Sequence, residues 1–161
     1  EYIMNAPAGD LLPLLEERLR RRGLDPDLLP RENRLGIVEE FRTRAKTLEE
    51  MAEGAGFFFA PWVTFDEKAA DKFLKPEIAG PLGRVRDAIA GVDPFVPGGV
   101  KAAFEGVLEA EGMKLGKLAQ PVRVALTGGT VSPGIFETLC LIGKERSLER
   151  IDTALSRIGQ H

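Results

Sequence analysis

The sequence predicts an all-α protein, a cage or bundle of short helices in two small lobes. Apolar residues recur at i, i+3 and i+4 through almost every periodic segment, and strict alternation over the length of a strand is nearly absent. The chain holds 11 prolines and 18 glycines, which keep the predicted helices short. Its 161 residues can bury a real core, and we expect lobes at residues 1–64 and 65–161.

The N-terminal lobe should begin with two amphipathic helices. The first runs from about residue 10 to 22 and stops at Gly23, and the second follows Pro30 and runs from about residue 31 to 44. Their inward faces are predicted to carry Leu11, Leu12, Leu15 and Leu19 in the first helix and Leu35, Val38 and Phe41 in the second.

A third helix is predicted to begin at Thr47. Glu50 follows three residues later, the spacing of a capping box, in which two side chains satisfy backbone N–H groups at the start of a helix. We expect Gly54 and Gly56 to end this helix.

The segment FFFAPWVTF (57–65) is the most apolar part of the chain. Pro61 in its middle excludes a regular central strand, so we expect a connector that packs the two lobes together. Further short helices are predicted at 66–74, 76–91 and 96–112.

The segment 114–146 is predicted to form two short helices joined by a stiff elbow. Gly128 and Gly129 can end the first helix with φ > 0, Ser132 can cap the second, and Pro133 suits its first position. The free N–H groups of that helix start would form a surface that a phosphate or a base can approach closely.

Pro121 should lie at a kink or at a helix start, because proline costs about 3 kcal/mol inside a regular helix. Either position would aim Gln120 and Arg123 in a defined direction. The planar fork of arginine can hydrogen-bond a base edge or stack on it, which suits unstacked RNA bases. The alternative is that Arg123 pairs with an acidic side chain on its own surface.

The sequence shows no catalytic constellation. Its one cysteine, Cys140, lies among apolar residues and is expected to pack rather than react, and a single cysteine excludes a disulfide framework and a multi-cysteine zinc site. Its one histidine is the terminal His161, for which we expect no function because chain ends are usually mobile. The glycines of TGGTVSPG match neither a Walker loop nor a dinucleotide-binding turn.

The formal net charge of −3 is unevenly distributed. Within 114–146, three lysines and two arginines stand against two glutamates, a balance of +3 that leaves −6 for the remainder. A locally basic lobe on an acidic chain is compatible with a specific anionic partner. We see neither a membrane-spanning run nor a signal peptide, and the missing initiating Met suggests a fragment or a processed product.

Three motifs of the C-terminal lobe resemble one known family. KLGKLAQPVRVALTG (114–128), SPGIFE (132–137) and LIGKER (141–146) follow in order and at the spacing found in the C-terminal anticodon-binding region of bacterial-type glutamyl-tRNA synthetases, class I aminoacyl-tRNA synthetases. A weaker similarity extends back through FRTRAKTLEEMA (41–52) to EYI (1–3). The resemblance thus covers essentially the whole chain, and in that family the region is an α-helical cage.

The resemblance implies roles for individual residues. Arg123 matches an arginine that contacts the anticodon, and Arg44, or Arg42 in the alternative register, matches one that helps read the third anticodon base. The residues that would pack on or border the bases are Gln120, Thr127, Ser132, Pro133, Gly134, Ile135 and Phe136. Lysines are expected to contact backbone phosphates, with Lys114, Lys117 and Lys144 as candidates.

The function implied is recognition of the anticodon of glutamate tRNA, and of glutamine tRNA as an alternative, by a cytoplasmic, monomeric module. A catalytic domain of the same full-length chain would attach glutamate with ATP and Mg²⁺. Its motifs are absent from these residues, so we expect them to be inactive alone and to hold no cofactor or metal. The competing hypothesis is a helical protein-interaction module that reuses the scaffold.

Overall fold

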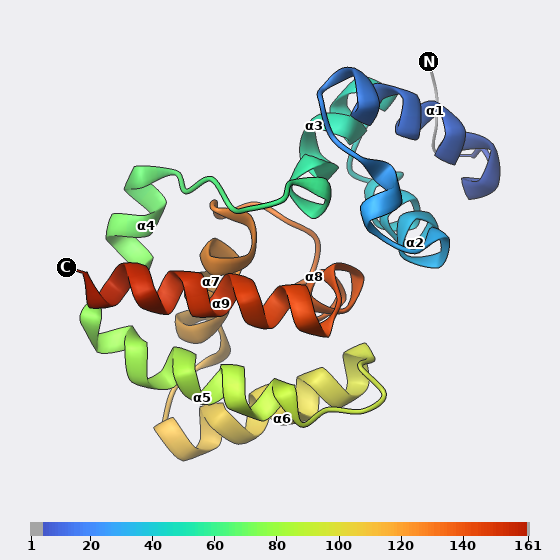
Figure 1. Cartoon of the computed structure of the whole chain (residues 1–161). Coiled ribbons are helices and arrows are strands. Elements are labelled where there is room, and N and C mark those ends of the chain that lie inside the picture. Colours follow the sequence, from blue (N-terminus) through green and yellow to red (C-terminus); the bar gives the residue numbers. More distant parts are fainter. Residues whose placement is uncertain (1–4, 161) are drawn as a thin grey trace. The chain divides into compact units, whose positions relative to one another are not determined.

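The computed structural model describes residues 5–160, so the EYI motif and His161 lie outside the described part (Figure 1). Residues 5–160 form helices, turns and loops without a strand, which confirms the all-α prediction. None of the helices described is long and apolar enough to cross a bilayer. The chain divides into two compact units, Glu1–Pro61 and Trp62–His161.

The first unit contains three α-helices and a short 3-10 turn. The helices are α1 (Ala8–Arg21), α2 (Arg31–Phe41) and α3 (Leu48–Phe59), and the turn is Pro26–Leu28. Each helix packs on the other two. The fully buried side chains of this core include Leu15, Leu19, Ile37, Met51 and Phe58.

The capping box that opens α3 is present. The hydroxyl of Thr47 accepts a hydrogen bond from the Glu50 backbone N–H at 3.1 Å. The Glu50 carboxylate accepts in return from the backbone N–H of Lys46, 3.4 Å away, one residue earlier than the standard pattern.

Two predicted helix ends in this unit are wrong. Helix α2 ends at Phe41, not near residue 44, and it buries Ile37 where Leu35 was expected. Helix α3 continues past both glycines to Phe59, so the predicted connector is helical over its first three residues. A Cβ on Gly54 would lie only 2.8 Å from Cε1 of Phe41, so this glycine permits close packing of α2 and α3 instead of ending a helix.

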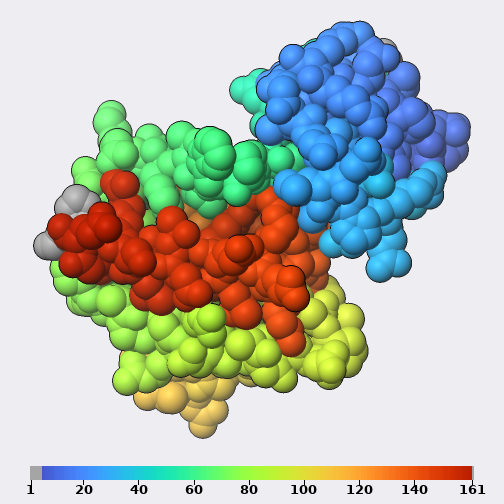
Figure 2. Space-filling model, viewed as in Figure 1, coloured from blue at the N-terminus to red at the C-terminus, as the bar shows by residue number. Residues whose placement is uncertain are grey.

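The second unit contains six α-helices and one 3-10 turn in its described part. In chain order they are α4 (Glu67–Phe73), the turn η2 (Pro76–Ile78), α5 (Ala79–Ala90), α6 (Pro97–Glu111), α7 (Leu115–Thr127), α8 (Ile135–Ile142) and α9 (Lys144–Gly159). Helix α5 packs on α6 and α9, α6 packs on α8, and α7 packs on α9. On the face drawn in Figure 2, the red α9 side chains border the yellow-green side chains of α5.

The linker before α4 belongs to this unit. The backbone N–H of Asp66 donates to the carbonyl oxygen of Gly128 at 2.8 Å, just past the end of α7. This contact ties residues that precede α4 to the α7 end. The division falls after Pro61, three residues before the predicted boundary after residue 64.

Pro121 lies inside α7, since the helix starts six residues earlier at Leu115. The prediction of a helix start at Pro121 is therefore wrong. The proline cannot donate the hydrogen bond that the Lys117 carbonyl would otherwise accept. Its ring is buried, and that burial offsets part of the cost.

Gly54→Ala should destabilise the first unit. The added Cβ overpacks against the buried Phe41 ring, which outweighs the gain in helix propensity, so the free energy of unfolding should fall by roughly 1–2 kcal/mol. The control is Gly83→Ala in α5, where a Cβ meets nothing within 4 Å and stability should hold or rise. The stability of both variants is measured by thermal and urea unfolding followed by circular dichroism. Equal changes in the free energy of unfolding would contradict the proposed close packing of Gly54 against Phe41.

Candidate functional site

The elbow, defined as residues 128–134 between α7 and α8, holds Arg123 in place. The Nε atom of Arg123 donates to the Ser132 hydroxyl at 2.8 Å, and its Nη1 atom donates to the side-chain oxygen of Gln120 at 2.7 Å. Gln120 and Arg123 are one turn apart on α7, and Ser132 reaches them from the elbow. Three of the residues that the sequence singled out therefore form one hydrogen-bonded group.

Ser132 does not cap α8, so that prediction is wrong. The N-cap residue is Gly134, without a side-chain cap, and Pro133 lies before the helix instead of at its first position. The Ser132 hydroxyl accepts from Arg123 and donates to the Pro133 carbonyl at 2.7 Å. Tertiary pairing with Arg123 has taken the group that would otherwise cap the helix.

Thr127 forms hydrogen bonds that stabilise the start of the elbow. Its hydroxyl oxygen accepts from the Gly129 backbone N–H at 3.0 Å and lies 2.9 Å from the Arg123 carbonyl, to which it can donate. Gly128 has φ of +86°, and a Cβ there would overlap the Thr64 carbonyl oxygen and lie 2.9 Å from its carbon. The turn thus needs glycine for both its backbone conformation and its contact with the linker.

The residues of the predicted base-packing segment differ in exposure. Pro133 and Ile135 are buried, and the half-buried Phe136 sets its ring edge-to-face against Phe104, with centroids 5.5 Å apart. These three side chains therefore pack mainly against the protein and present little surface to solvent. Val131 is 83% exposed at the tip, and the sequence analysis missed it although an apolar residue in a polar turn was a usable signal.

A buried arginine beneath the elbow was also missed. Nη1 of Arg150, on α9, donates to the carbonyl oxygen of Leu126 at 2.7 Å, in the last turn of α7. Burial, followed by the neighbouring charge of Arg146, lowers the pKa of Arg150 to about 10. Burial also lowers the pKa of Arg146. The signal was that Arg150 shares the buried stripe of α9 with Ser147 and Ala154.

The two candidate arginines of the first unit differ in accessibility. Arg42 forms an ion pair with Glu39, its side chain is 17% exposed, and its Nε atom is buried without a hydrogen-bond partner in the described part of the chain. Arg44 is exposed in the turn that follows α2. Of the two, Arg44 is the one that presents its side chain to solvent.

The three candidate lysines do not form one group. The amine of Lys144 donates to the carbonyl oxygen of Ala90 at the end of α5, 3.1 Å away, and lies 5.8 Å from the Phe95 ring centroid. A role in joining α9 to α5 accounts for it. Lys114 and Lys117 are exposed at the start of α7.

The thiol of Cys140 is the one cysteine side chain of the chain and lies partly buried on α8. Cys140 is half-buried, and burial, followed by the charge of Glu137, raises the pKa of its thiol to about 11. The thiol is therefore protonated at neutral pH. Within residues 5–160, no three His, Cys, Asp or Glu side chains are grouped so that they could hold a metal ion.

Comparison with known proteins places this geometry in context. The family model described as "Anticodon binding domain" matches residues 10–155. A glutamate–tRNA ligase of Geotalea uraniireducens is 39% identical over 155 residues, covering 96% of this chain and 33% of that protein. A second glutamate–tRNA ligase, from Alkalilimnicola ehrlichii, is 42% identical over 159 residues, which cover 98% of this chain and 33% of that protein. The chain thus spans about a third of the length of these relatives.

Solved structures agree with the sequence comparison. The crystal structure of a glutamate tRNA ligase from Elizabethkingia meningosepticum, in complex with its amino acid, superposes with a TM-score of 0.85 at 27% identity. The match covers 95% of this chain and 30% of that one. The crystal structure of the glutamate–tRNA synthetase from Elizabethkingia anophelis superposes with a TM-score of 0.79 at 26% identity.

Gly128→Ala should lower the free energy of unfolding by more than the cost of placing alanine in the left-handed region. A left-handed alanine costs about 1–2 kcal/mol, and the overlap with Thr64 should bring the loss to roughly 3 kcal/mol or more. Gly112→Ala is the matched control, since Gly112 also has positive φ (+64°) but a Cβ there meets nothing within 4 Å. Urea unfolding of both variants gives the difference, and equal losses would show that the linker contact carries no energy.

Alkylation of Cys140 should be slow at neutral pH. Because its thiol pKa is about 11, against about 8.5 for an ordinary thiol, the reaction rate with iodoacetamide should keep rising past pH 9. Glutathione measured in parallel supplies the ordinary profile. A rate for Cys140 that levels off with that of glutathione would contradict the burial effect.

Proposed function

The chain belongs to the anticodon binding domain family, as its motifs predicted, and from this premise we propose that it reads the anticodon of a tRNA as the C-terminal module of a glutamate–tRNA ligase. The observation that carries the proposal is the Arg123 side chain, held at an elbow by Ser132 and Gln120 in a chain of this family. A guanidinium that is already oriented loses little conformational entropy when it binds. Because its direction is fixed, it can favour one base over another.

The elbow supplies the parts that recognition of unstacked bases needs. Arg123 brings a planar guanidinium on which a base can stack, and the exposed Val131 offers an apolar surface at the tip. Arg146 and Arg150 lie on α9 with Glu149 as the acidic side chain near both, and Arg150 donates a hydrogen bond to the end of α7, so this part of α9 has a net positive charge close to the elbow. In this proposal that charge favours an RNA backbone close to the elbow.

Arg44 is our candidate for a second contact, in the first unit. Its exposure supports this choice over Arg42, which is largely covered and paired with Glu39. We propose that Arg44 helps read the third anticodon base of glutamate tRNA, with glutamine tRNA as the alternative substrate.

The parent reaction would attach glutamate to tRNA in a monomeric, cytoplasmic enzyme. ATP and Mg²⁺ would act in a catalytic domain of the same full-length chain. The contribution of these residues is to hold the anticodon so that the other end of the tRNA reaches that domain.

Arg123→Ala should remove anticodon preference. The probe is a glutamate-tRNA anticodon stem-loop, titrated against a loop of scrambled anticodon at low and moderate salt. The parent chain should prefer the matched loop, and the variant should lose roughly 1–3 kcal/mol of that preference, the size of a bidentate or stacking contact. The control is Arg84→Ala, which removes the same charge from an exposed position on α5.

Two results would count against the proposal. A parent chain that binds both loops equally has no reading function at the elbow. An Arg84→Ala variant that loses as much preference as Arg123→Ala would mean that net charge, not the oriented guanidinium, sets the affinity.

A further inference from the structure

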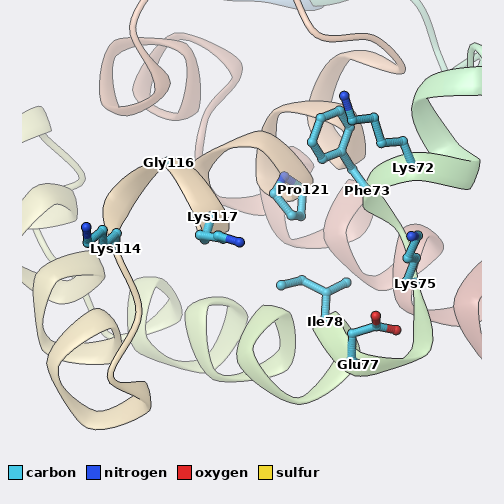
Figure 3. A pocket seen from close by; sticks show the side chains of 9 residues that line it. All are labelled: Lys72, Phe73, Lys75, Glu77, Ile78, Lys114, Gly116, Lys117 and Pro121. Atoms are coloured by element: carbon cyan, nitrogen blue, oxygen red, sulfur yellow. The ribbon is translucent and has the colours of Figure 1, made fainter.

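A hollow of about 730 Å³, here called the lysine pocket, opens where α4, the η2 turn and α7 meet (Figure 3). Its apolar lining is Phe73, Ile78 and Pro121. Lys72, Lys75, Lys114 and Lys117 line it together with Glu77 and Gly116. Pockets of this size commonly hold small organic ligands.

The charge of the lysine pocket is unusual for this chain. Four lysines and one glutamate give it a formal charge of +3, although the whole chain carries −3. Within residues 5–160, the ion pairs involve none of these four lysines. Glu77 is the one acidic side chain among these lining residues, so the lysines outnumber it and repel one another, and an anion that enters the pocket lowers this repulsion.

The side chains are placed to receive an anion with an apolar part. Figure 3 shows the Lys117 amine extending toward the middle of the hollow, with Pro121 and Ile78 beside it and Lys75 on the opposite wall. The Lys72 amine lies 5.2 Å from the centroid of the half-buried Phe73 ring. Gly116 lies in the first turn of α7, where the helix dipole also favours negative charge.

The lysine pocket and the elbow use different sides of α7. Successive residues of an α-helix are about 100° apart, so Pro121 and Arg123 point in directions about 200° apart. Pro121 lines the pocket, whereas Arg123 bonds to the elbow. A group seated in the pocket therefore cannot be the base that Arg123 contacts.

We propose that the lysine pocket binds one nucleotide, with its phosphate among the lysines and its sugar or base against the apolar lining. Lysines act as compact charges for phosphate, and an aromatic face such as that of Phe73 accepts any base. The nucleotide has two sources: a unit of the bound tRNA outside the anticodon, which rests on the proposed function, or a free mononucleotide, which does not.

The test is the double variant Lys75→Gln and Lys117→Gln in the whole chain. Its matched control is Lys46→Gln and Lys101→Gln, which removes two exposed lysines that do not line the pocket. Each protein is titrated with full-length glutamate tRNA over a range of salt, with a full-length tRNA of altered anticodon, and separately with AMP. Circular dichroism melting confirms that each variant is folded.

If the tRNA supplies the nucleotide, the pocket variant binds tRNA more weakly and its log–log salt slope falls by about 1 for each lysine lost. The preference for the matched anticodon stays that of the parent, so this result is separate from the elbow test. If a free nucleotide is the ligand, AMP binds the parent and control but not the pocket variant, even where tRNA recognition fails. Equal behaviour of the pocket and control variants toward both tRNA and AMP would overturn the proposal.

Discussion

The carbonyl groups at the C-terminal end of α7 must find hydrogen-bond donors, and the rest of the elbow depends on how they do so. Leu126 obtains its donor from the guanidinium of Arg150 on α9, and Gly128 obtains one from the backbone N–H of Asp66 in the linker. One helix end thereby joins three segments that are far apart in sequence. The glycine at position 128 makes this possible, because a side chain there would collide with the linker.

With the end of α7 held in this way, the side chains of the elbow have little freedom. Thr127 bonds the backbone on both sides of the turn, and Ser132 bonds both Arg123 and the Pro133 carbonyl. The part of the molecule that we propose reads RNA is therefore hydrogen-bonded at its base and exposed at its tip, where Val131 lies. Such a surface loses little entropy when a base packs on it.

Sequence reasoning found the elbow but not the lysine pocket. Gln120, Arg123 and Ser132 lie within thirteen residues of one another, so the helical spacing of the first two and the short elbow that follows them are visible in the sequence. The pocket unites Lys117 with Lys75, from a segment about forty residues earlier. No local pattern connects such positions, because the packing of α4 against α7 decides that they meet.

The sequence by itself determined the features that arise from local physics: the helical period, the Thr47 cap and a glycine pair at the end of α7, of which Gly128 has the positive φ. Tertiary structure decided the outcome at positions where the local preference of the sequence and the packing of distant residues differ. Helix α3 runs through Gly54, where the ring of Phe41 fills the space that a side chain would need, and Ser132 bonds Arg123 while Gly134 is the N-cap residue of α8. A local rule describes the isolated segment, whereas close contacts with distant residues can outweigh preferences of about 1 kcal/mol.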